Sequence, residues 1–229
     1  MNRKVLSIFG VVLLVLAINS CSSNPEKGLL DRYFNSLAMK DTTTLSTMAI
    51  SPAQFDFESY EIISISEEVV EPFALTDLAA KEDGLKKQQE ESVGVTLEAR
   101  DELDVAIFER NNARSRTARA AAQREVDKLQ EAYDKQREAH DQLTKDYNLA
   151  KEAASKEEEI ANFSLGGDYP NIRDFIGDVH KKDVEVKITM KDGQSNNYRI
   201  FLRRYMLEDE SMNMPHRGRW IIVRFEKLS

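Results

Sequence analysis

The chain of 229 residues has room for one or two domains. It carries 32 Lys and Arg residues against 40 Asp and Glu residues, a formal net charge of −8 at pH 7. A nucleic-acid backbone is bound by a basic stripe, so this acidic balance argues against nucleic acid as a partner.

Residues 1–20 have the layout of a signal peptide. Arg3 and Lys4 make a positive start, and the apolar run Val5–Ile18 is shorter than the roughly 20 residues that span a bilayer. Ile18-Asn19-Ser20-Cys21 follows and contains the only cysteine of the chain. This stretch resembles the signal and lipobox of bacterial lipoproteins, which implies that the Cys21 thiol is acylated and becomes the mature N-terminus. An ordinary secretory signal or an uncleaved anchor is the alternative.

The position of Cys21 fits a lipid anchor, because a secreted protein with one cysteine has no disulfide framework. Several acyl chains would anchor the protein durably in a membrane. Ser22 and Ser23 follow the cysteine, with no aspartate. In the lipoprotein family of enteric-type bacteria this pattern implies an outer-membrane anchor, and we expect the protein to face the periplasm. Residues 21–27 then form a polar tether.

A central stretch from Phe73 to Asp168 organises the rest of the chain. It contains no proline between Pro72 and Pro170 and is rich in good helix formers. Mostly apolar or small residues recur at alternating steps of three and four, as in a coiled coil, with a polar middle in the first series and polar interruptions at Gln136 and His140 in the second. The first series is Leu75, Leu78, Glu82, Leu85, Gln89, Ser92, Thr96, Ala99, Leu103 and Ala106. The second is Ala122, Val126, Leu129, Tyr133, Gln136, His140, Leu143, Tyr147, Ala150 and Ala154.

The two series are out of phase by two residues, which predicts a turn near Arg110–Thr117. Residues 72–164 are therefore expected to form a helical hairpin, in preference to one long helix. Leu103 and Ala106 should then lie close to the start of the returning helix, around Ala122 and Val126. The alternative, a single straight helix, would separate the strands on either side of it.

The flanking segments, 28–71 and 165–229, predict a small α+β body. We expect helices over Gly28–Met39, Thr42–Met48 (capped by Asp41) and Ile172–Val179. We expect strands over Phe55–Glu68, Val184–Met190, Tyr198–Leu207 and Arg219–Leu228, with a tight turn at Asp192-Gly193. The predicted fold class is α+β, a small antiparallel sheet with N-terminal helices, interrupted by a long coiled-coil hairpin.

Helices followed by a curved antiparallel sheet are similar to the cone-shaped NTF2-like domain. The stretch Leu29-Leu30-Asp31-Arg32-Tyr33-Phe34-Asn35-Ser36-Leu37-Ala38 resembles the opening helix of small NTF2-like lipoproteins. The resemblance covers the two body segments, with the hairpin in place of the usual third helix. It implies a cup between the opening helix and the sheet that could hold a small ligand or an active site.

The sequence provides no convergent set of catalytic residues and no cofactor motif. His140, His180 and His216 are scattered over different elements. No catalytic, cofactor or strong metal site is therefore predicted. Met212, Met214 and His216 form a sparse thioether and imidazole set that suits Cu(I), which makes weak copper binding an alternative.

Six arginines concentrate near the last two predicted strands: Arg199, Arg203, Arg204, Arg217, Arg219 and Arg224. Three interpretations are open. The arginines mark the solvated face of the sheet, they line a cup for an anionic ligand, or they bind an acidic face of the hairpin.

The leading functional hypothesis is a non-enzymatic, lipid-anchored envelope protein. Its hairpin would bind another envelope protein or further copies of the chain, with a holdase-like chaperone as one version. The main alternative is an NTF2-like domain that binds a small ligand or acts as an enzyme. The apolar faces predicted for residues 184–190 and 219–228 favour the non-enzyme.

Overall fold

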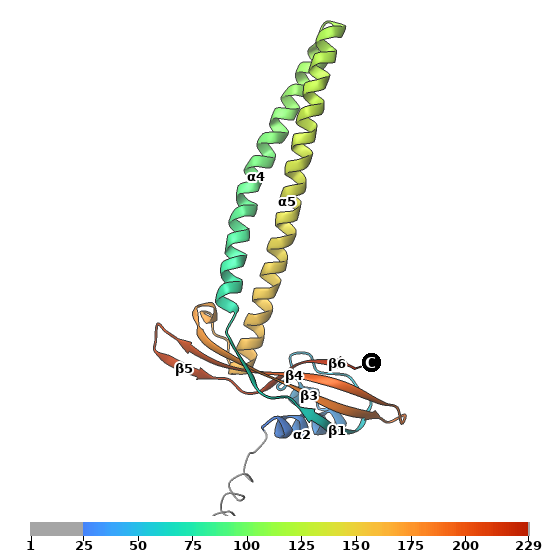
Figure 1. Cartoon of the computed structure of the whole chain (residues 1–229), viewed down its shortest axis with the longest axis vertical. Helices are drawn as coiled ribbons and strands as arrows, with labels where there is room; N and C mark the ends of the chain where they lie inside the picture. The colour runs from blue at the N-terminus through green and yellow to red at the C-terminus, as the bar shows by residue number, and fades with distance from the viewer. Residues whose placement is uncertain (1–24, 229) are drawn as a thin grey trace, which may run out of the picture. The chain divides into compact units, whose positions relative to one another are not determined.

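The computed structural model describes residues 25–228. The predicted signal peptide, Cys21 and most of the tether lie outside the described residues. The fold is α+β, with a curled antiparallel sheet and two long helices, as expected (Figure 1).

The elements follow the predicted order, except for two additional short strands and a 3-10 turn in place of the last expected helix. They are α2 (Pro25–Ala38), α3 (Thr42–Leu45), β1 (Phe57–Ile65), β2 (Val69–Pro72), α4 (Leu75–Asn112), α5 (Arg116–Leu165), the 3-10 turn η1 (Ile172–Asp174), β3 (Ile176–Met190), β4 (Ser195–Asp209), β5 (Met214–Arg217) and β6 (Ile221–Lys227). In the sheet, β3 pairs with β1, β2 and β4, and β4 also pairs with β5 and β6.

Two compact units share these elements. The sheet unit comprises the described residues up to Val69, Lys181–Arg203 and the residues from Trp220 onward. The hairpin unit comprises Val70–His180 and Arg204–Arg219. It therefore includes residues of β3, β4 and β5 as well as both long helices. The sequence-based boundaries at 72 and 164 stay a prediction.

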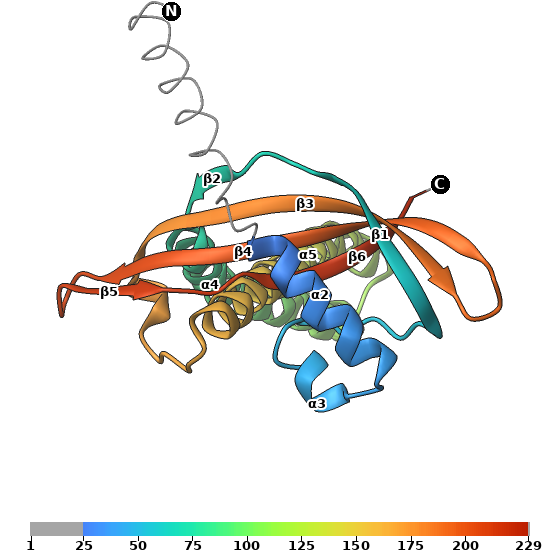
Figure 2. The ribbon, with the colours of Figure 1, turned by 90° about the horizontal axis from the view of Figure 1, so that it is seen from below.

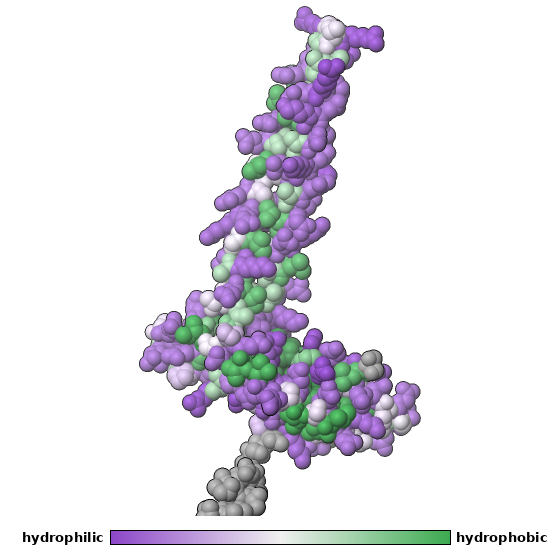
Figure 3. Space-filling model, viewed as in Figure 1, coloured by the Kyte–Doolittle hydropathy of each residue, from purple (hydrophilic) through white to green (hydrophobic). Residues whose placement is uncertain are grey.

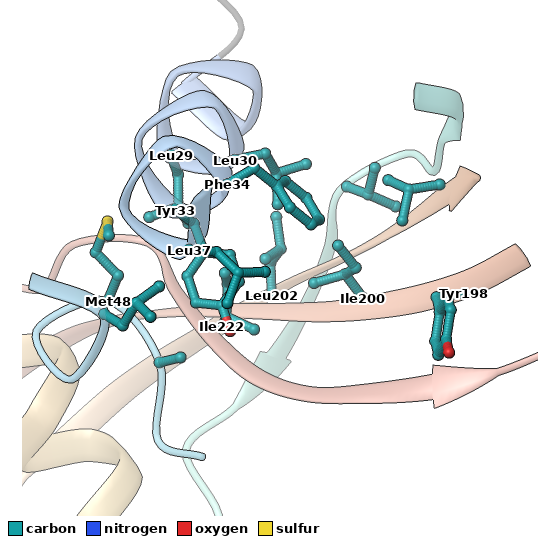
Figure 4. Packing of buried hydrophobic residues seen from close by; sticks show 14 of the residues in the cluster. Leu29, Leu30, Tyr33, Phe34, Leu37, Met48, Tyr198, Ile200, Leu202 and Ile222 are labelled. Atoms are coloured by element: carbon teal, nitrogen blue, oxygen red, sulfur yellow. The ribbon is translucent and has the colours of Figure 1, made fainter. Parts of the chain in front are cut away.

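The sheet unit is built around the apolar stripe of α2. Figure 2 shows α2 lying against the sheet. The buried residues of α2 recur at helical spacing and pack against the inward residues of β3, β4 and β6 (Figure 4). Residues from α2 are Leu29, Leu30, Tyr33, Phe34 and Leu37, and those from the strands include Val184, Val186, Ile188, Ile200, Leu202 and Ile222. The predicted opening helix is therefore confirmed, beginning three residues earlier than expected.

Antiparallel pairing sets the register of the strands. Tyr60 on β1 opposes Ile188 on β3, and Ile200 on β4 opposes Phe225 on β6. The predicted tight turn between β3 and β4 is present, and Gly193 adopts the positive φ of 84° that favours glycine. The predicted cap is also confirmed, because the Asp41 carboxylate accepts a hydrogen bond from the backbone N–H of Thr44.

The hairpin unit contains the two longest helices, which run side by side (Figure 1). Helix α4 ends at Asn112 and α5 begins at Arg116, inside the segment predicted to turn. Ser115 caps α5, since its side chain accepts a hydrogen bond from Ala118 N. Leu103 and Ala106 form one buried cluster with Val126, which confirms the predicted pairing across the turn.

The heptad series identified the facing sides of the helices almost completely. All ten positions of the first series are buried or half-buried, and so are those of the second series except Gln136. Gln136 is exposed, so its assignment to the seam was wrong. An exposed amide stays hydrated and avoids the cost of an unpartnered buried polar group.

Two sequence assignments after α5 were also wrong. The helix expected over Ile172–Val179 is only the 3-10 turn of η1, and Ile176 already begins β3. Gly177 explains the difference, since its carbonyl accepts a hydrogen bond from Phe73 N and its φ is 138°. A Cβ atom there would lie 2.2 Å from the carbonyl oxygen of Met206. Strand pairing therefore overrides local helix preference.

The segment expected as a loop around Met212 and Pro215 contains the short strand β5, paired with Met206–Asp209 of β4. Pro215 lacks a backbone N–H, which explains why sequence reasoning missed a strand here and why this strand is short.

Candidate interaction surface on the helical hairpin

The residues singled out for copper binding lie on and beside β5. Met212 and Met214 are exposed. The imidazole of His216 stacks on Phe175 at 5.0 Å between ring centroids and meets Tyr169 edge-on at 4.8 Å. This packing supplies a structural role for His216, and copper binding stays a prediction. Cys21, the expected lipidation site, lies outside the described residues.

The three histidines occupy separate environments. His140 lies in the hairpin seam, the Nδ1 atom of His180 lies 3.5 Å from an Arg204 guanidinium nitrogen, and His216 belongs to an aromatic cluster. Within residues 25–228, no group of three or more His, Cys, Asp or Glu side chains is arranged to hold a metal ion.

The six arginines divide between the two units, three in each. In the sheet unit, Arg199 donates to Glu185 at 2.8 Å, and the Arg224 guanidinium lies 3.9 Å from the centroid of the Phe201 ring. The hydrogen bond to Glu185 raises the pKa of Arg199. In the hairpin unit, Arg219 lies over the ring of Phe163. These contacts are those of charged residues on a solvated surface.

The space between α2 and the sheet is filled by side chains. Phe34 stacks on Tyr60 at 4.1 Å and on Phe57 at 5.1 Å, and Tyr33 packs against Phe225 at 5.4 Å. The Tyr33 hydroxyl accepts a hydrogen bond from Ala53 N. This apolar packing gives the ligand-cup alternative no support, and that alternative stays a prediction.

The hairpin is clamped at its base by Arg173 of η1. The guanidinium donates to Glu82 on α4 and to Glu158 on α5, each at 2.9 Å. The hydrogen bond to Glu158 contributes most to raising the pKa of Arg173, against a smaller opposing effect of burial. Sequence reasoning missed this residue, because a lone arginine in a short connecting segment carries no motif.

Halfway along the hairpin the seam is polar. Gln89 donates to the Thr144 hydroxyl at 3.2 Å, and Ser92 Oγ lies 2.7 Å from His140 Nδ1. Ser92 Oγ also donates to the carbonyl oxygen of Gln89. The four side chains are half-buried. The arms therefore hold each other by hydrogen bonds here, whereas apolar packing joins them near the turn.

Several large apolar side chains of α4 lie beside the seam and are exposed. Leu97, Val105 and Phe108 are 47%, 58% and 69% exposed. Helical spacing places them on one side of α4, away from the buried Leu103 and Ala106. Figure 3 shows apolar areas among the hydrophilic residues of the hairpin. Solvent covers these side chains in the single chain.

Leu97 and Val105 line an open groove of about 950 Å³ between the two helices. The groove also includes Gly94 and, from α5, Leu129. Its charged rim consists of Glu98, Asp101, Glu102, Glu125 and Lys128. Four carboxylates against one ammonium group make this rim strongly acidic, and the combination of apolar floor and charged rim is typical of a peptide- or helix-binding surface.

Comparison with known proteins gives no relative. No family model matches the chain, and neither a curated protein nor a solved structure matches it. Among the helices in residues 25–228, none combines the length and apolar character required to cross a membrane. The fold and the groove thus define an α+β protein with a helical hairpin that carries a candidate interaction surface.

Proposed function

We propose that the protein is a lipid-anchored component of the bacterial cell envelope and that its hairpin binds a protein partner. The lipobox-like segment ending at Cys21 supports the anchor, and the exposed side of α4 supports the interaction. We propose no catalytic activity for it. The outer membrane, with the protein facing the periplasm, is the proposed location.

The observation that carries this proposal is the exposure of Leu97, Val105 and Phe108 on one helix. Burying such side chains is favourable by about 25 cal/mol per Å² of apolar surface. The hairpin does not use them for its own stability, because its seam is formed by other residues. Leu97 and Val105 line one groove, and exposed apolar surface gathered in one place marks interaction sites.

The Ser92–His140 contact has the distance of a nucleophile and its base, so a hydrolase is the competing interpretation of the hairpin. Ser92 Oγ already donates its proton to the Gln89 carbonyl oxygen, which leaves the imidazole Nδ1 as the donor in the contact. A base must accept the hydroxyl proton. The pair is therefore better explained as a structural link between the arms.

Site-specific photocrosslinking in living cells tests the interaction. A photoreactive residue at Leu97, Val105 or Phe108 should give a discrete crosslinked product of defined mass. The matched controls are Lys145 and Lys151, which are exposed on α5 beyond the groove and should give little product. Equal crosslinking from both sets, or none from either, would show that this side of α4 is not an interaction surface.

A further inference from the structure

Charge is distributed in two opposite blocks next to the hairpin turn. Residues 90–109, at the end of α4, contain seven acidic residues and one basic residue. Residues 110–124, which form the turn and the start of α5, contain five arginines and no acidic residue. The basic block consists of Arg110, Arg114, Arg116, Arg119 and Arg124. An acidic chain thus presents a basic tip beside an acidic groove.

We propose that the tip of the hairpin binds the tip of a second copy of this chain, in antiparallel overlap. The arginines of each copy then lie along the acidic groove rim of the other. This inference rests on the proposed interaction role of the hairpin and names its partner. The contact is isologous, so each copy contributes both blocks and the interface closes as a dimer.

Positions along the helix locate the twofold axis. At 1.5 Å per residue, Val105 lies about 10 Å from the end of α4, and Glu98 lies about 20 Å from it. On the same scale Arg114 and Arg116 lie close to zero, Arg119 lies about 5 Å along α5 and Arg124 about 12 Å along it. Overlap that brings Arg114 and Arg116 against Glu98 and Asp101 of the other copy places the axis near Val105. Opposite charges then meet on both sides of the axis.

The same overlap covers the exposed apolar residues. Val105 meets its own counterpart near the axis, and Phe108 packs beside it against the groove of the other copy. Ala118 and Ala121 on α5 are exposed and small, so the backbones can approach closely on that side. Apolar contact at the centre and ion pairs around it are the normal layout of a protein interface.

The charge pattern favours a second copy over an anionic membrane. Arginines with a nearby exposed phenylalanine also suit a lipid surface, but four rim carboxylates lie within the same segment and would be repelled by it. A parallel pairing of two hairpins is disfavoured too, because it brings like charges together. Only antiparallel overlap pairs the acidic block of each copy with the basic block of the other.

The overlap is short, about 20 Å along each hairpin. An interface of this extent falls at the low end of specific interfaces, so we expect a weak dimer that forms at micromolar concentrations or above. Its ion pairs lie at the solvated rim, so association should weaken as salt shortens the Debye length from about 10 Å at 0.1 M to about 3 Å at 1 M.

Charge reversal on the full chain, purified in excess detergent, provides the first test. One variant replaces Arg114, Arg116, Arg119 and Arg124 with glutamate, and another replaces Glu98, Asp101, Glu102 and Glu125 with lysine. Sedimentation should show a salt-sensitive dimer for the parent chain and monomers for each variant. An equal mixture of the two variants should dimerise again, which also demonstrates that both are folded. The control, with Lys135, Arg137, Lys145 and Lys151 replaced by glutamate, should dimerise like the parent chain.

Thiol crosslinking provides the second test. A Val105→Cys chain treated with a short bismaleimide should form a covalent dimer, whereas Val95→Cys, also exposed on α4 but farther from the turn, should not. The parent chain, which has only Cys21, gives the background. A monomeric parent chain at high micromolar concentration, or monomers in the mixture, overturns the dimer. If photocrosslinking from Val105 then captures a different protein, the proposed function stands and only the identity of the partner is wrong.

Discussion

Ser92 Oγ and His140 Nδ1 lie 2.7 Å apart although 48 residues separate them in the chain. The contact joins the two helices of the hairpin at a half-buried point of the seam. A polar pair at a seam position fixes the register of two helices, because shifting the helices leaves both groups without a partner. The pair therefore specifies how α4 and α5 align more than it stabilises them.

Replacing both residues with leucine should stabilise the hairpin and reduce its specificity. Two leucines at seam positions bury apolar surface worth about 1–2 kcal/mol in total at a half-buried site. We expect a higher midpoint of chemical denaturation, followed by circular dichroism, together with larger oligomers in sedimentation. Ser92→Ala alone should instead cost about 0.5–1.5 kcal/mol, because His140 loses its partner.

Arg173→Ala should destabilise the hairpin unit. It removes both ion pairs at the base and leaves Glu82, which is only 8% exposed, without its cation. We expect the free energy of unfolding to fall by about 1–3 kcal/mol. This is less than the loss for a fully buried ion pair, because Arg173 is partly solvated. Denaturant unfolding measures it. The exposed Arg100, paired with Asp101, is the control, and Arg100→Ala should cost less than about 0.5 kcal/mol. Equal losses of unfolding free energy in Arg173→Ala and Arg100→Ala would contradict the role of Arg173 as a clamp.

Tyr33 makes the sheet unit sensitive to alkaline pH. Burial raises the pKa of Tyr33 from 10.0 to about 12. As the pH rises, the Tyr33 hydroxyl loses its proton in the unfolded chain before it does so in the folded chain. The contribution of the protonated Tyr33 to the free energy of unfolding is therefore complete below pH 10 and is lost as the pH rises toward 12. Tyr60 adds to this loss, since burial and Asp31 raise its pKa as well.

Tyr33→Phe should show a smaller alkaline loss when unfolding free energies are compared between pH 9 and pH 12. At neutral pH the variant should be less stable by about 1–2 kcal/mol, because Ala53 N loses its acceptor. Tyr147→Phe, in the hairpin seam, is the control and should keep the alkaline loss of the parent chain. An unchanged pH profile in Tyr33→Phe would contradict this assignment.

Cys21→Ala tests the lipid anchor. If Cys21 is acylated, the variant should remain as uncleaved precursor and should not incorporate labelled fatty acid, since no thiol is present to accept it. Ser20→Ala keeps a small residue before the cysteine and should be labelled normally. Undiminished labelling of Cys21→Ala would rule out the lipoprotein hypothesis.

Shortening both arms tests whether the hairpin is a modular extension. Removing residues 86–99 and 133–146 deletes two heptads from each helix and shortens the hairpin by about 20 Å. The polar part of the seam is lost, while the base clamp and the buried cluster at the turn remain. We expect a folded protein with cooperative unfolding by circular dichroism. Loss of all cooperative structure would show that the middle of the hairpin is needed for folding.

Local sequence patterns determined the elements that depend on periodicity. The stripe of Leu29, Tyr33 and Phe34 predicted α2 and its buried side. The phase change between two heptad series located the hairpin turn within a few residues. Both predictions succeeded because a helix places residues three and four apart on one side, whatever surrounds it.

Tertiary structure decided what depends on contacts between distant segments. The buried residues of β4 alternate as Tyr198, Ile200 and Leu202 and then as Tyr205 and Leu207, and this change at Arg203–Arg204 has no local sequence signal. The base clamp likewise depends on a distant partner, since Arg173 bonds to Glu82, 91 positions away in the chain. Hydrogen bonds and ion pairs form between groups that the fold brings together. Their partners therefore become visible only when the chain is folded.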